Sequence, residues 1–183
     1  MLIISVLMIS VRIELIFINK GLTLTHLMTP TDPADLDLEA LPGHFIRRLQ
    51  QIAVAVFLQE TEPFGVTPVQ YASLQAIRRT PGIDQRSLAR SIGLDTSTMA
   101  GVIDRLETRG LMVRSASPDD RRVRLLSLTD EGQALLGQVE PAVLRAQTRM
   151  LEPLPKKEQQ TFMRMLREIV KANNDLSRAP SQD

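Results

Sequence analysis

Ten arginines lie between residues 78 and 124, and they are the side chains of this sequence best suited to bind a charged partner. This segment carries ten basic side chains against six acidic ones, whereas residues 1–77 carry four against seven and residues 125–183 carry eight of each. A guanidinium presents a planar fork of donors that fits phosphate oxygens, base edges and narrow minor grooves. The net charge of +1 therefore conceals a basic segment that suits a nucleic acid, although a solvated charged surface would have the same composition.

Small and hydroxyl-bearing side chains gather in residues 96–109, for which a helix is predicted. The apolar residues of this helix share one face, at Met99, Val102, Ile103 and Leu106. The positions left to face a partner are Thr96, Ser97, Thr98, Ala100, Gly101, Arg105 and Thr108. Small side chains there would let the backbone approach the floor of a DNA major groove, while hydroxyls bond to bases and Arg105 meets a phosphate. The alternative is that the hydroxyls only cap the helix, and nearby Asp104 is unfavourable beside DNA unless an arginine neutralises it.

A turn sequence, Ser-Pro-Asp-Asp at residues 117–120, is followed directly by Arg121 and Arg122. Because proline and aspartate favour tight turns, both arginines are expected at the tip of a hairpin. There a guanidinium can enter the minor groove, attracted by its negative potential, or can stiffen the hairpin through a salt bridge with Asp119 or Asp120. Three residues that open a short predicted helix are further candidates for phosphate contacts: Gln85, Arg86 and Ser87.

Start and stop signals predict the elements that would position these side chains. Helices are predicted over residues 43–60, 68–79, 85–92, 96–109 and 155–174, with a long helix that starts at residue 130. The expected N-caps are Thr67, Asp84, Asp95 and Thr129, and the expected strands cover 111–116 and 122–128. Two short helices joined by a glycine-containing turn and followed by a hairpin form a winged helix-turn-helix. The predicted fold is mainly α with a small β-hairpin wing, flanked by N- and C-terminal helices whose apolar stripes can form a dimer interface.

Several classes of protein are excluded by what the sequence lacks. It has no cysteine, which excludes disulfides and thiol chemistry and fits a reducing cytoplasm. Its two histidines, His26 and His44, accompany no glycine-rich phosphate loop, no G-x-S-x-G elbow and no metal-ligand cluster, so we expect neither an enzyme nor a cofactor. Residues 1–27 are apolar but interrupted by Arg12 and Glu14, and they are interpreted as a misplaced start or loose extension rather than a membrane segment.

The run LARSIGLDTSTMAGVIDRLETRGLMVRSASPDDRRVRLLSLTDEGQALL resembles the core of the MarR family of winged-helix regulators. The resemblance lies in the capped recognition helix, the D-R-L-E-x-x-G-L exit, the D-x-R wing and the L-T-x-x-G start of the long helix, and it covers about residues 41–172. It implies a homodimer on a pseudo-palindromic operator, with Asp120 and Arg122 as a structural pair in the wing. The expected organisation is a 1–40 extension, a 41–175 domain with dimerisation helices 43–60 and 130–175 and a DNA-binding lobe 67–129, and a 176–183 tail.

The resemblance also implies an effector, because many MarR-type regulators release DNA when a small aromatic acid binds between the dimer helices and the winged lobe. The segment PGHFIRRLQQIAVAVF is similar to the first helix of MarR-type regulators of aromatic and pyridine carboxylate breakdown, which makes a hydroxynicotinate-type acid one candidate. The expected ligand-binding residues are His44, Arg48 and Gln51 on one helical stripe, completed by Gln70 and Tyr71. An arginine can bind a carboxylate with two hydrogen bonds, although polar residues at the margin of an amphipathic helix are often only solvated.

Together these features predict a sequence-specific regulator of transcription that binds double-stranded DNA, most simply a ligand-responsive repressor. The alternative is a winged-helix module that binds a protein instead of DNA. Salt dependence separates the two, because phosphate binding weakens steeply with salt through counterion release and a mainly apolar protein contact does not.

Overall fold

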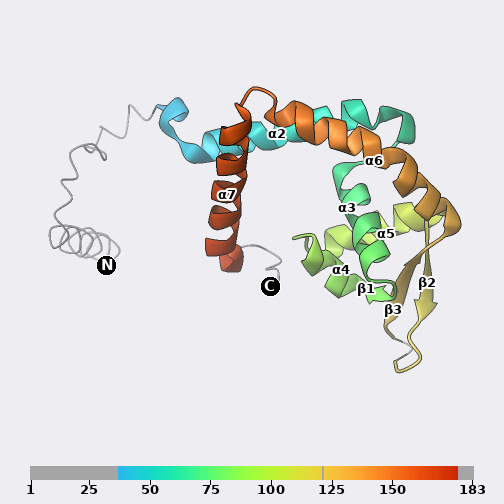
Figure 1. The fold of residues 1–183 in the computed structure, drawn as a ribbon. Coiled ribbons are helices and arrows are strands. Elements are labelled where there is room, and N and C mark those ends of the chain that lie inside the picture. Colours follow the sequence, from blue (N-terminus) through green and yellow to red (C-terminus); the bar gives the residue numbers. More distant parts are fainter. Residues whose placement is uncertain (1–36, 121, 177–183) are drawn as a thin grey trace, which may run out of the picture. The chain divides into compact units, whose positions relative to one another are not determined.

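The computed structural model describes residues 37–120 and 122–176. In chain order the elements are η2 (Leu38–Ala40), α2 (Pro42–Glu60), η3 (Glu62–Phe64), α3 (Pro68–Arg79), β1 (Ile83–Asp84), α4 (Gln85–Ser91), α5 (Thr96–Thr108), β2 (Met112–Ala116), β3 (Arg124–Leu128), α6 (Asp130–Leu151), α7 (Lys156–Ala172) and η4 (Asn174–Leu176). Two short helices, α4 and α5, are followed directly by the β2–β3 hairpin (Figure 1). The predicted winged helix-turn-helix is therefore confirmed.

The chain divides into two compact units, residues 1–45 and 46–183, with the boundary inside α2. The described part of the first unit is η2 and the first turn of α2, where the rings of His44 and Phe45 meet edge to face with centroids 5.6 Å apart. The extension at residues 1–27 and most of the tail at 176–183 fall outside the described residues. No described helix combines the length and the apolar character that a membrane span needs.

Each of the four helices α3 to α6 begins at a side chain that caps it. Asp84 accepts hydrogen bonds from the backbone N–H groups of Arg86 and Ser87, and Asp95 accepts one from Thr98. The Oγ1 atoms of Thr67 and Thr129 accept in the same way from residues three positions on, which begins α3 and α6. These groups satisfy N–H donors that have no partner inside a helix, so all four predicted caps are confirmed.

The sheet has the strand order β1-β3-β2 and is antiparallel throughout. Strand β1 is not among the predicted elements; its two residues pair with Leu125 and Leu126 of β3. Strands β2 and β3 start one and two residues later than predicted. Leu111 is held by its N–H to the carbonyl of Leu106 at the end of α5, and Val123 still belongs to the turn, because its N–H donates to Asp120.

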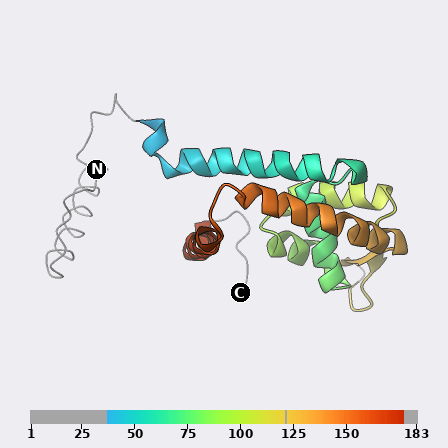
Figure 2. The ribbon, with the colours of Figure 1, turned by 45° about the horizontal axis from the view of Figure 1, so that its top comes forward.

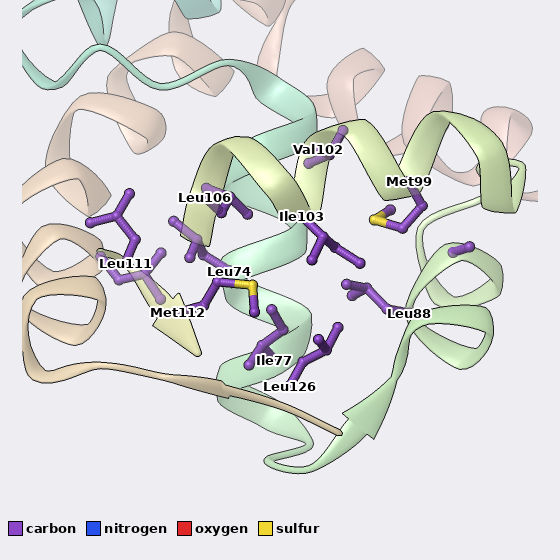
Figure 3. Packing of buried hydrophobic residues seen from close by; sticks show 12 residues of the cluster. Leu74, Ile77, Leu88, Met99, Val102, Ile103, Leu106, Leu111, Met112 and Leu126 are labelled. Atoms are coloured by element: carbon purple, nitrogen blue, oxygen red, sulfur yellow. The ribbon is translucent and has the colours of Figure 1, made fainter. Parts of the chain in front are cut away.

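The core of the lobe lies between α3, α4, α5 and the sheet (Figure 3). All four apolar residues predicted to face inward from α5 are at most 3% exposed, namely Met99, Val102, Ile103 and Leu106. They pack against Leu74 and Ile77 of α3, Leu88 of α4, and Met112 and Leu126 of the sheet. Burying the apolar side of α5 fixes its polar side toward solvent, which is the side that can meet a partner.

A second, smaller core joins the end of α2 to α6, which run side by side (Figure 2). It consists of Phe57, Val66, Val139 and Val143. At its edge the carboxylate of Glu60 pairs with Arg145 at 3.1 Å and Arg149 at 3.4 Å. The α6 helix is thereby fixed both to α2 and, through Leu136, to the core of the DNA-binding lobe.

Candidate nucleic-acid interface

The outer side of α5 presents hydroxyl groups that already donate their protons in hydrogen bonds within the protein. Ser97 and Thr98 are exposed, and their hydroxyls donate to the two carboxylate oxygens of Asp95 at 2.5 and 2.7 Å. These bonds, together with the backbone N–H of Thr98, lower the pKa of Asp95 far below its ordinary value, so the carboxylate is ionised and can only accept. The hydroxyl oxygens therefore face solvent as hydrogen-bond acceptors.

One turn further along α5, Gly101 lies close to the guanidinium of Arg105. A β-carbon built on Gly101 would meet only an Arg105 nitrogen, at 3.5 Å, which is ordinary van der Waals contact. The fold itself therefore does not require glycine here. Arg105 is exposed and has no ion pair within the described part of the chain, so its charge is available to a phosphate.

Asp104, the unfavourable carboxylate beside this face, is neutralised by Arg114 of β2. The guanidinium of Arg114 pairs with Asp104 and, at 3.1 Å, with Glu107. Because Arg114 belongs to the wing and both carboxylates belong to α5, this pair holds the wing against the recognition helix. The Nε atom of Arg114 is buried without a hydrogen-bond partner among the described residues, whereas the two carboxylates that its guanidinium contacts are exposed.

At its other end α5 is tied to the loop that follows α2. The guanidinium of Arg109 donates to the carbonyl oxygens of Gly65 at 2.7 Å and Phe64 at 3.1 Å. Gly65 has a φ of 59°, a left-handed conformation that favours glycine and turns these carbonyls toward the arginine. The recognition helix is thus positioned by the wing on one side and by the α2–α3 loop on the other.

The three candidates that open α4 have different surroundings. Gln85 donates from its side-chain amide to the carbonyl of Thr96 at 3.2 Å, which links the starts of α4 and α5. Ser87 donates its hydroxyl to Asp84 at 2.6 Å, and Arg86 is exposed. Partial burial raises the pKa of Asp84, but the hydrogen bonds from the Ser87 side chain and from backbone N–H groups outweigh it and lower that pKa below 3.8.

In the wing, Asp120 accepts a hydrogen bond from the backbone N–H of Arg122 at 2.9 Å. The expected pair of Asp120 and Arg122 thus forms through the backbone, and the exposed Arg122 guanidinium has no ion pair with any described residue. Arg121, the other arginine predicted for the wing tip, falls outside the described residues. The wing turn is therefore shaped by Asp120 while the charge of Arg122 remains available.

Two arginines that the sequence does not single out join this surface. Arg90 of α4 and Arg124 of β3 line a hollow of about 470 Å³ between α4 and the base of the wing, together with Arg86 and Arg122. We call these four residues the arginine notch. Two of them lie on α4 and two lie in or beside β3, so only the pairing of β3 with β1, directly before α4, brings them together.

The five residues expected to bind an effector are not all in one place. Tyr71 lines a pocket of about 490 Å³ whose other polar lining residues include Gln75, Arg78, Arg79 and Glu140; its hydroxyl is 2.7 Å from the Gln75 amide nitrogen. The Gln70 side chain instead accepts from the backbone N–H of Thr67, completing a capping box, and is 7% exposed. Arg48 and Gln51 are exposed on α2, where Gln51 accepts from Arg47, and His44 lies in the first unit.

Comparison with known proteins identifies the family. The model of the MarR family matches residues 66–123, which run from the start of α3 to the wing. A putative transcriptional regulatory protein for the hcr operon of Thauera aromatica is 34% identical over 152 residues, covering 78% of this chain and 92% of that protein.

Three solved structures have the same fold. The PcaV regulator of Streptomyces coelicolor, in complex with its natural ligand, is 37% identical with a TM-score of 0.68, covering 75% of this chain and 96% of PcaV. The repressor CouR of Rhodococcus jostii, bound to a 23-mer DNA duplex, is 34% identical with a TM-score of 0.69, covering 73% and 94%. BpsR of Bordetella bronchiseptica, whose DNA binding is regulated by 6-hydroxynicotinic acid, is 28% identical with a TM-score of 0.69, covering 77% and 97%.

The Thauera aromatica protein and PcaV are described as transcriptional regulators, and CouR as a transcriptional repressor. The winged helix-turn-helix, the matching family model and a relative 34% identical along 92% of its length lead to one conclusion. This chain belongs to the MarR family of transcription regulators.

Proposed function

We propose that this protein is a repressor that binds a pseudo-palindromic DNA operator as a homodimer and releases it when a small aromatic carboxylate binds. The observation that carries DNA binding is the exposed polar side of α5 beside a wing whose free guanidinium, Arg122, has no protein partner among the described residues. A helix of this kind fits the major groove while an arginine on the wing reaches the adjacent minor groove. CouR, bound to a DNA duplex, supports the assignment.

We assign the direct contacts with DNA bases to the first two turns of α5. The residues placed there are Thr96, Ser97, Thr98, Ala100 and Gly101. Because the hydroxyls of Ser97 and Thr98 donate to Asp95, they offer acceptors to the groove and select the amino group of adenine or cytosine. Arg105, Gln85, Arg86 and Ser87 flank them and hold the backbone phosphates, which set position but not sequence.

The proposed homodimer is supported by apolar side chains that the protomer leaves uncovered. Helix α7 has no buried residue, yet Met165, Ile169 and Val170 on one of its sides are 49%, 54% and 67% exposed. A contiguous apolar surface of this kind marks a contact with another molecule. A second copy of the chain places two recognition helices on one duplex, about 34 Å apart, which supplies the affinity that a single helix lacks.

The effector is proposed from the pocket beside Tyr71 and from the relative BpsR, which responds to 6-hydroxynicotinic acid. An aromatic ring fits against Tyr71, Ile83 and Ile92, and its carboxylate requires a cation. Arg48 of α2, which is not among the residues that line this pocket, is the proposed partner of that carboxylate. Arg48 forms no hydrogen bond or ion pair within the described residues, in contrast to its neighbour Arg47.

The test starts with selection of duplexes bound by the full chain from a random DNA pool, followed by addition of hydroxynicotinate and hydroxybenzoate. We expect an enriched inverted repeat and its release by at least one acid. Arg48→Ala should abolish release without weakening apo DNA binding, and Arg47→Ala should respond as the wild type does. Release of DNA by Arg48→Ala at wild-type acid concentrations would refute Arg48 as the partner of the carboxylate, and failure to enrich any duplex would refute DNA binding itself.

A further inference from the structure

The arginine notch gathers four cations around a single carboxylate. Its lining includes one acidic residue, Asp84, whose carboxylate already accepts from the Ser87 hydroxyl and from two backbone N–H groups. Arg86, Arg90, Arg122 and Arg124 form no hydrogen bond or ion pair through their side chains with any other residue of 37–120 and 122–176. The notch is therefore a concave site that is strongly positive in the free protein.

Four arginines elsewhere in the described residues do have an acidic partner. Arg114, Arg145, Arg149 and Arg164 each contact a carboxylate of this same chain. Converging guanidinium groups repel one another, and only solvent screening reduces that cost. An anion that enters the notch removes the repulsion, and a phosphate group matches the planar donor fork of each guanidinium.

The notch also lies where a DNA backbone would pass. It joins α4, which precedes the recognition helix, to the base of the wing, and Arg122 of its lining belongs to the wing turn. A duplex that has α5 in its major groove and the wing in the next minor groove has its intervening phosphates between those two elements. A small carboxylate ligand could bind the same charges, but the position of the notch beside the expected course of the DNA backbone favours a backbone phosphate.

We propose that the arginine notch holds a backbone phosphate of the bound duplex, with Arg90 and Arg124 as positioning contacts that add affinity without adding sequence preference. This assignment rests on the proposed DNA-binding function. It gives Arg90 and Arg124, which lie outside the recognition helix and the wing turn, a direct part in binding.

The experiment measures operator affinity by fluorescence anisotropy from about 50 to about 200 mM salt, for the wild type and for the double variant Arg90→Gln, Arg124→Gln. The slope of log affinity against log salt falls by about 0.9 for each phosphate that the protein no longer neutralises, or about 1.8 for a dimer on two half-sites. The bases enriched from a random pool stay the same. Thermal unfolding at low salt checks the fold, and the melting temperature should not decrease, because the variant removes two like charges.

The control is Arg167→Gln, which removes the same kind of charge from an exposed position of α7 and should leave the slope unchanged. A wild-type slope in the folded double variant would overturn the notch while leaving DNA binding intact. An equal decrease of the slope in Arg167→Gln would also overturn it, because the effect would then come from net charge alone. If the wild type binds no duplex, the proposed DNA-binding function itself is wrong. That result can be distinguished from the two outcomes above, in which the wild type binds DNA.

Discussion

Gly101 and Gly132 occupy helix positions for opposite reasons. A β-carbon on Gly132 would collide with the carbonyl oxygen of Leu111, so the start of α6 can approach β2 only through glycine. Gly101 faces no such obstacle, yet glycine inside a helix costs about 1 kcal/mol relative to alanine. Gly101 therefore lowers the stability of α5 without being required by the fold, which supports its proposed place against the bases of DNA.

We expect Gly101→Ala to raise the free energy of unfolding by about 0.5–1 kcal/mol and to weaken operator affinity about tenfold. The gain comes from the lower entropy of the unfolded chain, and the weaker binding comes from a methyl group placed between α5 and the bases. Chemical denaturation and DNA titration measure the two effects. Gly137→Ala is the matched control, since Gly137 lies inside α6 with open space around it; it should gain stability and keep its affinity. Unchanged affinity in Gly101→Ala would remove this glycine from the interface.

Asp84 and Asp95 make the DNA-binding lobe sensitive to acid. The pKa of each is lower in the folded chain than its ordinary value of 3.8. A depressed carboxylate pKa adds stability above the unfolded pKa, and that stability is lost as the pH falls through the folded pKa. We expect the melting temperature to drop between about pH 4 and about pH 2, and the double variant Asp84→Asn, Asp95→Asn to show a shallower drop. Asparagine still caps helices well, so the double variant should fold. Equal profiles of melting temperature against pH for the wild type and the double variant would show that these two carboxylates do not cause the loss of stability in acid.

At the scale of elements, the wing and α5 are joined by the pairing of Arg114 with Asp104 and Glu107. We expect Arg114→Gln to lower the free energy of unfolding by about 1 kcal/mol and to weaken DNA binding, because Asp104 is then unneutralised beside the phosphates. Arg164→Gln breaks an exposed pair within α7 and serves as control, with a decrease of about 0.3–0.5 kcal/mol and no effect on affinity. Equal DNA affinity for the wild type and Arg114→Gln would show that the wing does not depend on this pair.

The elements that can be predicted correctly are those defined by neighbouring residues. Thr67, Asp84, Asp95 and Thr129 cap helices through bonds that span two or three residues, and so their signals are visible in the sequence. Strand β1 has no such signal because its two residues become a strand only by pairing with the distant strand β3. The wing strands are slightly shorter than predicted because hydrogen bonds of adjacent turns hold their expected first residues.

The difference between local contacts and contacts between distant residues also decides which parts of the site can be predicted. The inward and outward sides of α5 follow from helical periodicity, but the arginine notch depends on bringing Arg90 next to Arg124, which no local pattern encodes. Asp104 needs a neutralising arginine, and the sequence shows that need without identifying Arg114 as the partner. The role of Gln70 has a local signal, since Thr67 followed three residues later by glutamine is a capping box.

In the proposed complex, tight operator binding requires two copies of the chain. Ile169→Glu places a charge on the uncovered apolar side of α7 and should dissociate the dimer, with operator affinity reduced by more than about 100-fold because each protomer then binds alone. Arg167→Glu, two residues before Ile169 and therefore on the opposite side of the helix from it, should remain dimeric. Sedimentation analysis and DNA titration measure both. A dimeric, fully active Ile169→Glu variant would contradict the assignment of α7 to the interface.

The proposed mode of DNA recognition depends on the polar side of α5 and the wing forming one continuous surface for a duplex. The chain has no cysteine, so a chemical nuclease can be attached at a single introduced cysteine: Ser97→Cys on α5, Asp119→Cys in the wing turn, or Arg167→Cys on α7. With the selected operator bound, we expect strand cleavage from positions 97 and 119, within one helical turn of about 10 base pairs, and none from position 167. Cleavage from position 167 alone, or from 97 and 119 at unrelated places on the duplex, would contradict a single continuous surface.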